Sequence, residues 1–208
     1  MSKTLSKSGL AVILSKLEGF KQQKVRVEQY STDSELAATV LWDAYMKGYL
    51  EGNVADMGCG TGILGLGTML LGCKEVFFVE NDENALEIAK TNYEKLKSEG
   101  LMLGKANFIL SDISEFNTQV DVIIENPPFG TKVEHADRVF LEKAMKISKL
   151  IYSFHKSESK GFIEAFSRDN GFKVKETLDF KYPLKKSLNF HKKKIHYFDV
   201  SCFILERI

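Results

Sequence analysis

Residues 53–62 have the sequence NVADMGCGTG, a short apolar strand that runs directly into a glycine-rich turn. The next segment, 63–71, is typical of a helix, and 75–79 is typical of a second strand that leads to Glu80. Alternate glycines allow a tight turn and a close approach of the backbone to a ligand, and the first helical turn has free N–H groups. Together these segments predict an α/β fold with a ligand site at the glycine turn.

Two kinds of ligand are compatible with this turn. Residues 60–65, GTGILG, match the G-x-G-x-x-G pattern of dinucleotide-binding proteins, with Glu80 about 20 residues further on. Asp56 extends the glycines to D-x-G-x-G-x-G, which favours a nucleoside with a cationic amino-acid tail and no pyrophosphate. We expect Asp56 near an ammonium group, as a cap on the loop amides, or in both roles. Glu80 is placed to accept hydrogen bonds from two ribose hydroxyls.

A second motif follows the apolar run 120–124, which predicts a buried strand. It consists of Asn126, Pro127, Pro128 and Phe129, at the strand end where ligands bind in open α/β sheets. Proline lacks an N–H and has a fixed φ, so the carbonyl groups here have a rigid direction. The Asn126 amide and the Pro127 carbonyl can each accept one N–H, and Phe129 can stack on a ring. The motif therefore predicts a site for a planar group with an exocyclic amino group.

The central part of the chain alternates between strand and helix patterns, which predicts a mostly parallel sheet with helices on both faces. We expect strands near 53–57, 75–80, 106–111, 120–125 and 149–154, and helices near 62–71, 83–98, 136–148 and 157–169.

The two ends of the chain depart from this alternation. Residues 172–182 and 195–205 are typical of two strands joined by a basic loop, an antiparallel pair that brings the sheet to seven strands. Near the start, Thr32-Asp33-Ser34-Glu35 matches a capping box that opens a helix through about Met46. We expect a leader over 1–30, with one helix near 5–17 that packs on the core, and a single domain over 31–208.

Composition excludes several classes of protein. The chain has 208 residues, 44% of them hydrophobic, and a net charge of +1, so it is not globally basic. The absence of an apolar run of about 18 residues predicts no transmembrane helix, and Leu10–Leu14 is too short for the core of a signal peptide. Three widely spaced cysteines indicate reduced thiols and a cytoplasmic protein. Four scattered histidines without a Cys/His cluster predict no metal site.

Basic and aromatic residues are concentrated near the end of the chain, which favours a nucleic-acid substrate over a protein substrate. Residues 180–198 contain six lysines and two histidines, with interleaved aromatic residues and no acid. A cationic groove follows phosphates, and aromatic rings stack on splayed single-stranded bases. The residues that we expect to bind RNA are Lys132, His191, Lys192, Lys193 and Lys194.

The chain resembles class I S-adenosylmethionine-dependent methyltransferases. More narrowly, it is similar to the archaeal and eukaryotic family that methylates N6 of adenine in small-subunit ribosomal RNA. The resemblance covers nearly the whole chain and rests on segments 28–32, 56–62, 126–132, 152–156 and 190–194. The family's pattern has Pro where Ser31 stands and often Cys where Thr61 stands. Neither change affects the expected chemistry, since both positions chiefly offer backbone.

The resemblance implies S-adenosyl-L-methionine as the cofactor, the Rossmann-like class I fold, and a possible partner, a small zinc-binding methyltransferase activator. It also implies that Gln29 and Thr32 lie near the methionine end of the cofactor, although Thr32 alternatively serves only as a helix N-cap. Asp112 is expected to accept from the adenine amino group, or only to cap a turn, while Ile113 offers its N–H. The full set of expected cofactor contacts is Gln29, Thr32, Asp56, Gly58, Gly60, Thr61, Gly62, Ile63, Glu80, Asn81, Asp112, Ile113 and Asn126.

Three hypotheses about function remain open. The favoured one is methyl transfer to N6 of an adenosine in ribosomal RNA, with residues 126–129 holding the amine. A second is methylation of DNA adenine or of a protein glutamine, because the same motif accepts a nucleobase amine or a carboxamide. The third is a non-catalytic RNA-binding module or a dinucleotide-binding oxidoreductase on a related sheet. Intact Asn126 and Glu80 argue against the RNA-binding module.

Overall fold

A computed structural model of the chain describes residues 5–20, 32–128, 136–184 and 196–208, with the backbone alone for 136, 182–184 and 196–198. Its centre is one seven-stranded sheet with the strand order β3-β2-β1-β4-β5-β7-β6. The strands are β1 (Asn53–Met57), β2 (Glu75–Glu80), β3 (Lys105–Leu110), β4 (Val122–Glu125), β5 (Leu150–Lys156), β6 (Phe172–Leu184) and β7 (His196–Arg207). The helices are α1 (Lys7–Leu14), α2 (Ser34–Met46), α3 (Ile63–Leu70), α4 (Glu83–Ser98), α5 (Ala136–Ile147) and α6 (Lys160–Asp169), with short 3₁₀ turns η2 (Ile113–Glu115) and η3 (Ser157–Ser159).

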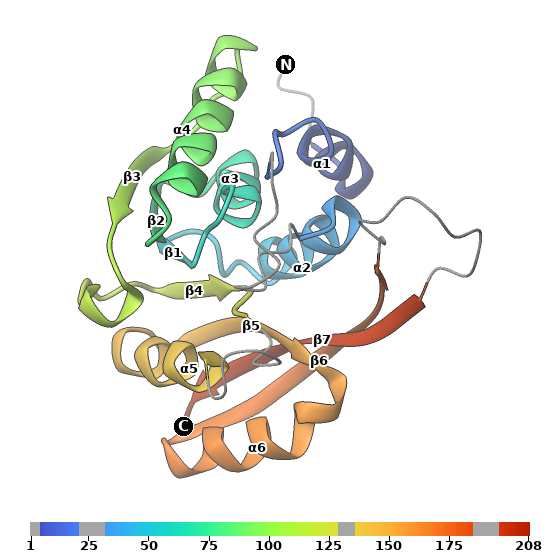
Figure 1. Ribbon diagram of the computed structural model, residues 1–208, viewed down its shortest axis with the longest axis vertical. Coiled ribbons are helices and arrows are strands. Elements are labelled where there is room, and N and C mark those ends of the chain that lie inside the picture. The colour runs from blue at the N-terminus through green and yellow to red at the C-terminus, as the bar shows by residue number, and fades with distance from the viewer. Residues whose placement is uncertain (1–4, 21–31, 129–135, 185–195) are drawn as a thin grey trace.

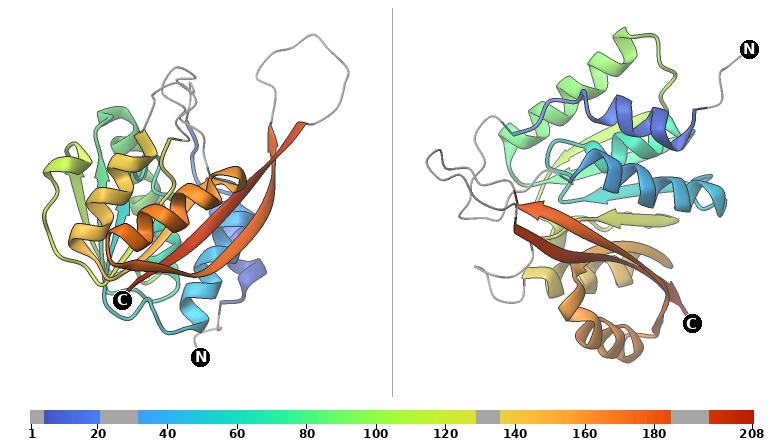
Figure 2. Two further views of the ribbon diagram at one scale, coloured as in Figure 1. Left: turned by 90° about the horizontal axis from the view of Figure 1, so that it is seen from below. Right: turned by 90° about the vertical axis from the view of Figure 1, so that its right-hand side faces the viewer.

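The predicted fold class is confirmed. Strands β1 to β5 are parallel, and β7 pairs antiparallel with both β5 and β6 to form the C-terminal hairpin. Helices cover both faces of the sheet: α1 to α4 lie on one face, and α5 and α6 on the other (Figures 1 and 2). Because all five parallel strands end at the same edge, the segments that follow them are brought together there.

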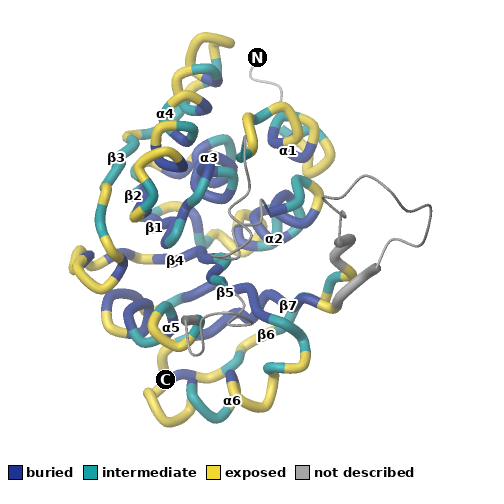
Figure 3. Tube along the Cα trace, in the orientation of Figure 1, coloured by how far each residue is buried: buried dark blue, intermediate teal, exposed yellow. Residues whose placement is uncertain are grey.

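The sheet separates two hydrophobic cores, as the alternation of side chains along each strand requires. Val54, Val122 and Tyr152 belong to the core under α1 to α4, and Ala55 and Ile123 belong to the core under α5 and α6. Strands β4 and β5 are almost entirely buried, whereas the outer faces of α4 and α6 are exposed (Figure 3). The edge of the sheet that carries the site therefore adjoins strands whose side chains are almost all buried.

Two predicted helix starts differ from the structure. The N-cap of α2 is Asp33 and not Thr32, because the Asp33 carboxylate accepts hydrogen bonds from the amides of Glu35 and Leu36. The single helix expected over 157–169 begins as the 3₁₀ turn η3, and regular α-helix starts only at Lys160. The remaining elements lie within a few residues of their predicted ranges, as is usual for element ends.

Candidate active site

The segments after β1 and β4 begin side by side, because these two strands are neighbours in the sheet. Met57, the last residue of β1, is in register with Glu125, the last residue of β4. From β1 the chain continues through α3 to β2 on one side, and from β4 through α5 to β5 on the other. Such a switch point leaves a crevice at the carboxyl ends of the strands, where ligands bind in open α/β sheets.

Two glycines of the loop over 58–62 are closely packed against aromatic side chains. Gly58 has a φ of +67°, and a Cβ there would come within 2.8 Å of the Phe140 ring from α5. Gly60 has a φ of +54°, and its Cβ would come within 3.1 Å of the Phe20 ring from the leader. Both the backbone conformation and the close packing exclude a larger side chain at these two positions.

Two carboxylates hold this loop from inside. Asp56 is 1% exposed, and its Oδ2 accepts a hydrogen bond of 2.7 Å from the amide of Gly65 in the first turn of α3. Burial, partly offset by this hydrogen bond, raises the pKa of Asp56 to about 7. Glu80 at the end of β2 accepts from the amides of Gly60, Asn81 and Asp82, each at 2.9 Å.

These contacts refine two expectations from the sequence. Asp56 does cap backbone amides, and its expected proximity to an ammonium group remains a prediction. A carboxylate offers about four acceptor positions, and three of those on Glu80 are taken by backbone amides. Glu80 therefore keeps one acceptor position unoccupied by backbone amides, and its expected contact with two ribose hydroxyls remains a prediction.

The nitrogen of the Asn126 side-chain amide has a hydrogen-bond partner, and its oxygen has none among the described residues. Its Nδ2 donates to Thr32 Oγ1 at 3.0 Å, and Thr32 itself is 7% exposed. Asn126 Oδ1 is buried and has no hydrogen-bond partner among the residues that the structure describes. Buried acceptors are rarely left unpaired, so this oxygen is available to an N–H group of a ligand. Pro127 is buried and Pro128 is half-buried beside it.

Asp112 and Ile113 follow β3 at the same edge. The Asp112 carboxylate caps the 3₁₀ turn, because its Oδ1 accepts from the amide and the hydroxyl of Ser114. These hydrogen bonds lower the pKa of Asp112, so the carboxylate is ionised. Ile113 is buried, and Asn81 after β2 is exposed. The cap is thus present, and contacts of these residues with adenine remain predictions.

Asn92 is a site residue that the sequence reasoning missed. It lies on α4, is fully buried, and joins the leader to the glycine loop. Its Nδ2 donates to the carbonyls of Glu18 and Thr61 at 3.0 Å, and its Oδ1 accepts from the Glu18 amide at 2.7 Å. One signal was available in the sequence: an amide residue at a position of α4 where the helical spacing predicts an apolar one.

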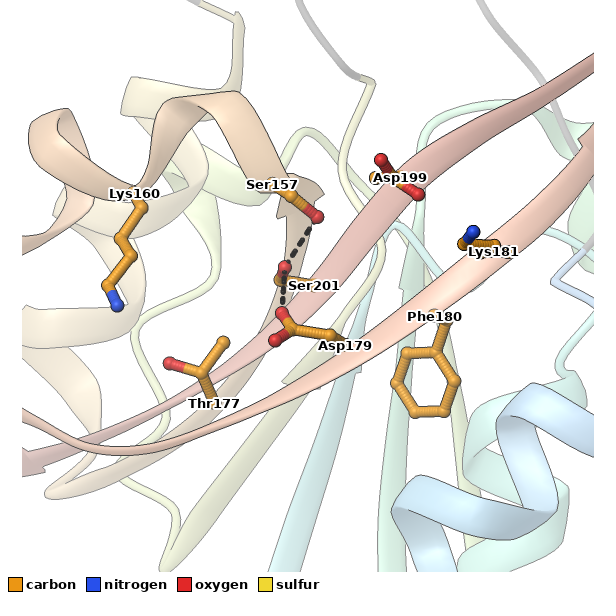
Figure 4. A pocket seen from close by; sticks show the side chains of 8 residues that line it. All are labelled: Ser157, Lys160, Thr177, Asp179, Phe180, Lys181, Asp199 and Ser201. Atoms are coloured by element: carbon orange, nitrogen blue, oxygen red, sulfur yellow. Dashed lines mark hydrogen bonds between the residues drawn. The ribbon is translucent and has the colours of Figure 1, made fainter.

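Several predicted site residues lie outside the described residues: Gln29, Phe129, Lys132, His191, Lys192, Lys193 and Lys194. Of the six lysines in 180–198, only Lys181 has a described side chain. It lines a cleft of about 440 Å³ between the hairpin and α6 (Figure 4), and the lining residues are Ser157, Lys160, Thr177, Asp179, Phe180, Lys181, Asp199 and Ser201. Two lysines face two aspartates there, so this cleft is charge-balanced and is not the basic surface that the sequence predicts.

The described part of the chain contains neither a cluster of metal ligands nor a membrane-spanning helix. No group of three or more His, Cys, Asp or Glu side chains could hold a metal ion there. No helix among these residues is long and apolar enough to cross a membrane. Cys59, Cys73 and Cys202 are buried free thiols.

The strand order, the glycine loop after β1 and the Asn-Pro-Pro segment after β4 define a class I methyltransferase, whose methyl donor is S-adenosyl-L-methionine. The chain belongs to the methyltransferase small-domain family, whose model matches residues 29–149.

Relatives and solved structures agree with this assignment. A Danio rerio protein named rRNA N(6)-adenosine-methyltransferase METTL5 is 31% identical, covering 87% of this chain and 89% of the relative. A crystal structure from Pyrococcus horikoshii, described as a candidate RNA methyltransferase, is 42% identical with a TM-score of 0.86, covering 97% and 98% of the two chains. The magnesium protoporphyrin IX methyltransferase of Synechocystis, solved with bound S-adenosylmethionine, shares only the fold, at 14% identity and a TM-score of 0.64 over 95% and 90%.

Proposed function

We propose that this protein transfers the methyl group of S-adenosyl-L-methionine to N6 of an adenosine in ribosomal RNA. The observation that carries the proposal is the buried Asn126 Oδ1, which lacks a partner among the described residues and stands beside the glycine loop. The relatives from Danio rerio and Drosophila melanogaster, both named rRNA N(6)-adenosine-methyltransferases, support the same substrate here.

The cofactor site in this proposal is the glycine loop with the carboxylates around it. The loop glycines have positive φ values and carry no side chains of their own, which fits the close approach of a nucleoside to the backbone. Glu80 keeps one acceptor position for a ribose hydroxyl. Asn81, Asp112 and Ile113 follow β2 and β3 at the same edge and offer the polar groups that adenine needs. Bound S-adenosyl-L-methionine supplies an electrophilic methyl group.

The acceptor amine is held by hydrogen-bond acceptors and needs no strong base. An adenine amino group is a weak nucleophile, because its lone pair is delocalised into the ring. Asn126 Oδ1 and the Pro127 carbonyl accept hydrogen bonds from its two N–H groups, which favours a pyramidal nitrogen and stabilises the positive charge that develops there. Thr32 accepts from Asn126 Nδ2 and so directs Oδ1 toward the substrate. Phe129, as in the sequence prediction, stacks on the flipped base.

The structure gives a physical argument against the dinucleotide alternative. Dinucleotide-binding proteins bind a pyrophosphate at the N-terminus of the helix after the glycine turn. Here the buried carboxylate of Asp56 already accepts from Gly65 in the first turn of α3. A pyrophosphate at this helix terminus would meet the Asp56 oxygens and would find the Gly65 amide already paired.

We also propose the finer assignments that the resemblance implies. The substrate is small-subunit ribosomal RNA, held by Lys132 and by His191 to Lys194. A small zinc-binding activator subunit is a partner, and the edge strand β3 is its docking surface. No strand pairs with the outer side of β3 among the described residues, and Leu110 and Met102 beside it are 53% and 95% exposed. Buried free thiols fit the reducing cytoplasm.

The test uses purified protein, tritium-labelled S-adenosyl-L-methionine and ribosomal RNA stripped of protein, with genomic DNA and a glutamine-containing protein substrate in parallel. We expect label in N6-methyladenosine from small-subunit RNA. Label only in DNA or protein would overturn the RNA substrate and keep the amino-methyl chemistry. Measurable cofactor binding without label in any substrate, with label appearing only when the activator subunit is added, would make that subunit obligatory.

Asn126→Ala is the variant that tests the mechanism. We expect kcat to fall by about 100-fold or more, because one of the two acceptors for the amine is lost. The Kd for S-adenosyl-L-methionine, measured by calorimetry, should change by less than about threefold, or about 0.7 kcal/mol. Asn170→Ala makes the same chemical change at the exposed end of α6 and should leave both quantities unchanged. Equal losses in kcat and cofactor affinity would refute the assigned role.

A further inference from the structure

The segment 152–156, YSFHK, is part of the family resemblance but has no role in the mechanism above. It forms most of β5, whose side chains alternate between the two cores. Tyr152 and Phe154 pack in the core under α1 to α4. Ser153 and His155 point to the opposite face, where they are 0% and 1% exposed. Two buried polar side chains in a central strand require hydrogen-bond partners.

These two residues and their partners form one row of side chains next to the Asn-Pro-Pro segment. Ser153 Oγ lies 2.7 Å from Glu125 Oε1 and 2.7 Å from His155 Nε2. His155 Nδ1 lies 3.8 Å from Asp137 Oδ2, at the start of α5. Glu125 is fully buried and in register with Ser153, and the next residue along the chain is Asn126. Figure 1 shows α5 beside β5.

The positions of the protons in this row of hydrogen-bonded side chains depend on whether Glu125 is ionised. A serine hydroxyl has one proton, so Ser153 can donate to Glu125 or to His155, and not to both. If Glu125 is a neutral carboxylic acid, it donates to Ser153, Ser153 donates to Nε2 of His155, and Nδ1–H faces Asp137. If Glu125 is ionised, Ser153 must donate to it. A neutral His155 then either turns a bare Nε2 toward the Ser153 oxygen or, as the other tautomer, turns a bare Nδ1 toward the Asp137 carboxylate. The chain is therefore complete with neutral histidine only when Glu125 carries a proton.

The surroundings favour the protonated form. Burial raises the pKa of Glu125 to about 8 and lowers the pKa of His155, so both are neutral at neutral pH. Met57 of β1 is in register with Glu125, Phe203 of β7 is in register with Ser153, and both are apolar. The Cys202 thiol, whose pKa burial raises, is a further titratable neighbour among the described residues. No cation faces Glu125 among the described residues, and its Oε2 has no partner there.

We propose that Glu125, Ser153 and His155 are positioning residues for methyl transfer, and that their neutral hydrogen-bonded chain fixes the direction of the Asn126 amide. The proposal rests on the proposed function only in that Asn126 holds the substrate amine. This row of hydrogen bonds joins the end of β4 to β5, and His155 at its end lies 3.8 Å from Asp137 of α5. Ionised Glu125 reverses the Ser153 hydrogen bond and leaves an unpaired charge one residue from Asn126. Misplacement of a reacting group by about 1 Å can cost about 100-fold in rate.

The kinetic test compares pH profiles of kcat for the full-length protein and its variants. Wild-type kcat should fall as the pH rises through about 8, because Glu125 ionises. Glu125→Gln, whose amide still donates to Ser153 but cannot ionise, should keep the neutral-pH kcat within about threefold and lose this decline. Ser153→Ala interrupts the chain and should lower kcat by about tenfold or more, with KM and cofactor Kd nearly unchanged.

Matched controls separate positioning from folding. Ser167→Ala also removes a buried serine hydroxyl, but Ser167 lies on α6 and its Oγ has no partner among the described residues. Its kcat should equal that of the wild type. Circular dichroism and cofactor Kd identify any variant that fails to fold. Retention of the alkaline decline in Glu125→Gln, or a wild-type kcat in Ser153→Ala, would overturn the proposal even when Asn126→Ala is inactive.

A readout independent of activity distinguishes this proposal from the proposed function. Infrared spectroscopy should show the carbonyl band of a buried carboxylic acid that disappears as the pH rises through about 8. The band should be absent in Glu125→Gln. If the band is missing in the wild type, the neutral chain is wrong, whatever the enzyme methylates. If the band is present and RNA accepts no label, the proposed substrate fails and the protonated chain stands.

Discussion

Asp56 shows how one buried carboxylate organises the cofactor loop. The side chain points from β1 to the first turn of α3 and accepts a hydrogen bond from the Gly65 amide. Its carboxyl group therefore lies at the helix N-terminus, where the helix dipole is positive. Burial dominates nevertheless, and the nearby Glu80 carboxylate adds repulsion, so the pKa of Asp56 is raised to about 7. The folded protein therefore prefers Asp56 protonated over a pH range in which the unfolded chain ionises it.

This preference predicts a pH dependence of stability that Asp56→Asn removes. The contribution of Asp56 is fully present below a pH of about 3.8, the ordinary value, and is lost as the pH rises to about 7. The asparagine amide oxygen can still accept from Gly65 and does not titrate. We expect the free energy of unfolding of Asp56→Asn, relative to the wild type, to increase between these pH values in urea titrations. A difference that stays constant with pH would contradict the assigned protonation.

At the scale of elements, the leader and α4 together fasten the glycine loop. The segment after α1 crosses the loop, with Phe20 packed against Gly60 and the Glu18 backbone bonded to Asn92. The same Asn92 amide donates to the Thr61 carbonyl. Three elements that are distant in sequence thus meet at one side chain, and the loop conformation depends on all of them.

We therefore expect Asn92→Ala to weaken cofactor binding indirectly, through the glycine loop. Loss of its hydrogen bonds leaves the Glu18 and Thr61 backbone groups unpaired, and we expect the Kd for S-adenosyl-L-methionine to rise by about tenfold. Thr91→Ala is the matched control, because Thr91 is the exposed neighbour on α4. Calorimetry that finds the same Kd for both variants would exclude a role of Asn92 in holding the loop.

At the scale of the whole molecule, the hydrophobic core extends into the leader. Leu10 and Leu14 of α1 are 0% and 2% exposed and belong to the same cluster as Leu41 of α2 and Val54 of β1. Val12, on the other side of α1, is 54% exposed. If the leader folds together with the rest of the chain, truncation of its buried side chains must lower the stability of the whole protein.

Leu10→Ala tests this coupling. We expect the free energy of unfolding to fall by about 2–5 kcal/mol, the usual cost of a cavity at a buried leucine. Val12→Ala should change it by no more than about 0.5 kcal/mol, because the side chain is largely in water. Both values come from denaturant unfolding followed by circular dichroism. A separate low-stability transition for Leu10→Ala would mean that the leader unfolds independently of the sheet.

The sequence by itself determined the fold class and the two motifs at the carboxyl edge of the sheet. These depend on local regularities: the alternation of strand and helix patterns, the glycines at 58, 60 and 62, and the prolines at 127 and 128. Backbone conformation follows from such residues directly, because glycine permits a positive φ and proline fixes φ. The parallel arrangement then places both motifs at one edge without further information.

Only the tertiary structure decided which side chains share hydrogen bonds. Asn92 meets Glu18 across 74 positions, Thr32 meets Asn126 across 94, and Glu125 meets Ser153 across 28. Nothing local in the sequence brings these residues together, since each contact results from the packing of elements that are distant in the chain. Burial adds the second reason: the pKa values of Asp56 and Glu125 are raised by loss of water around them, a property of the packed core.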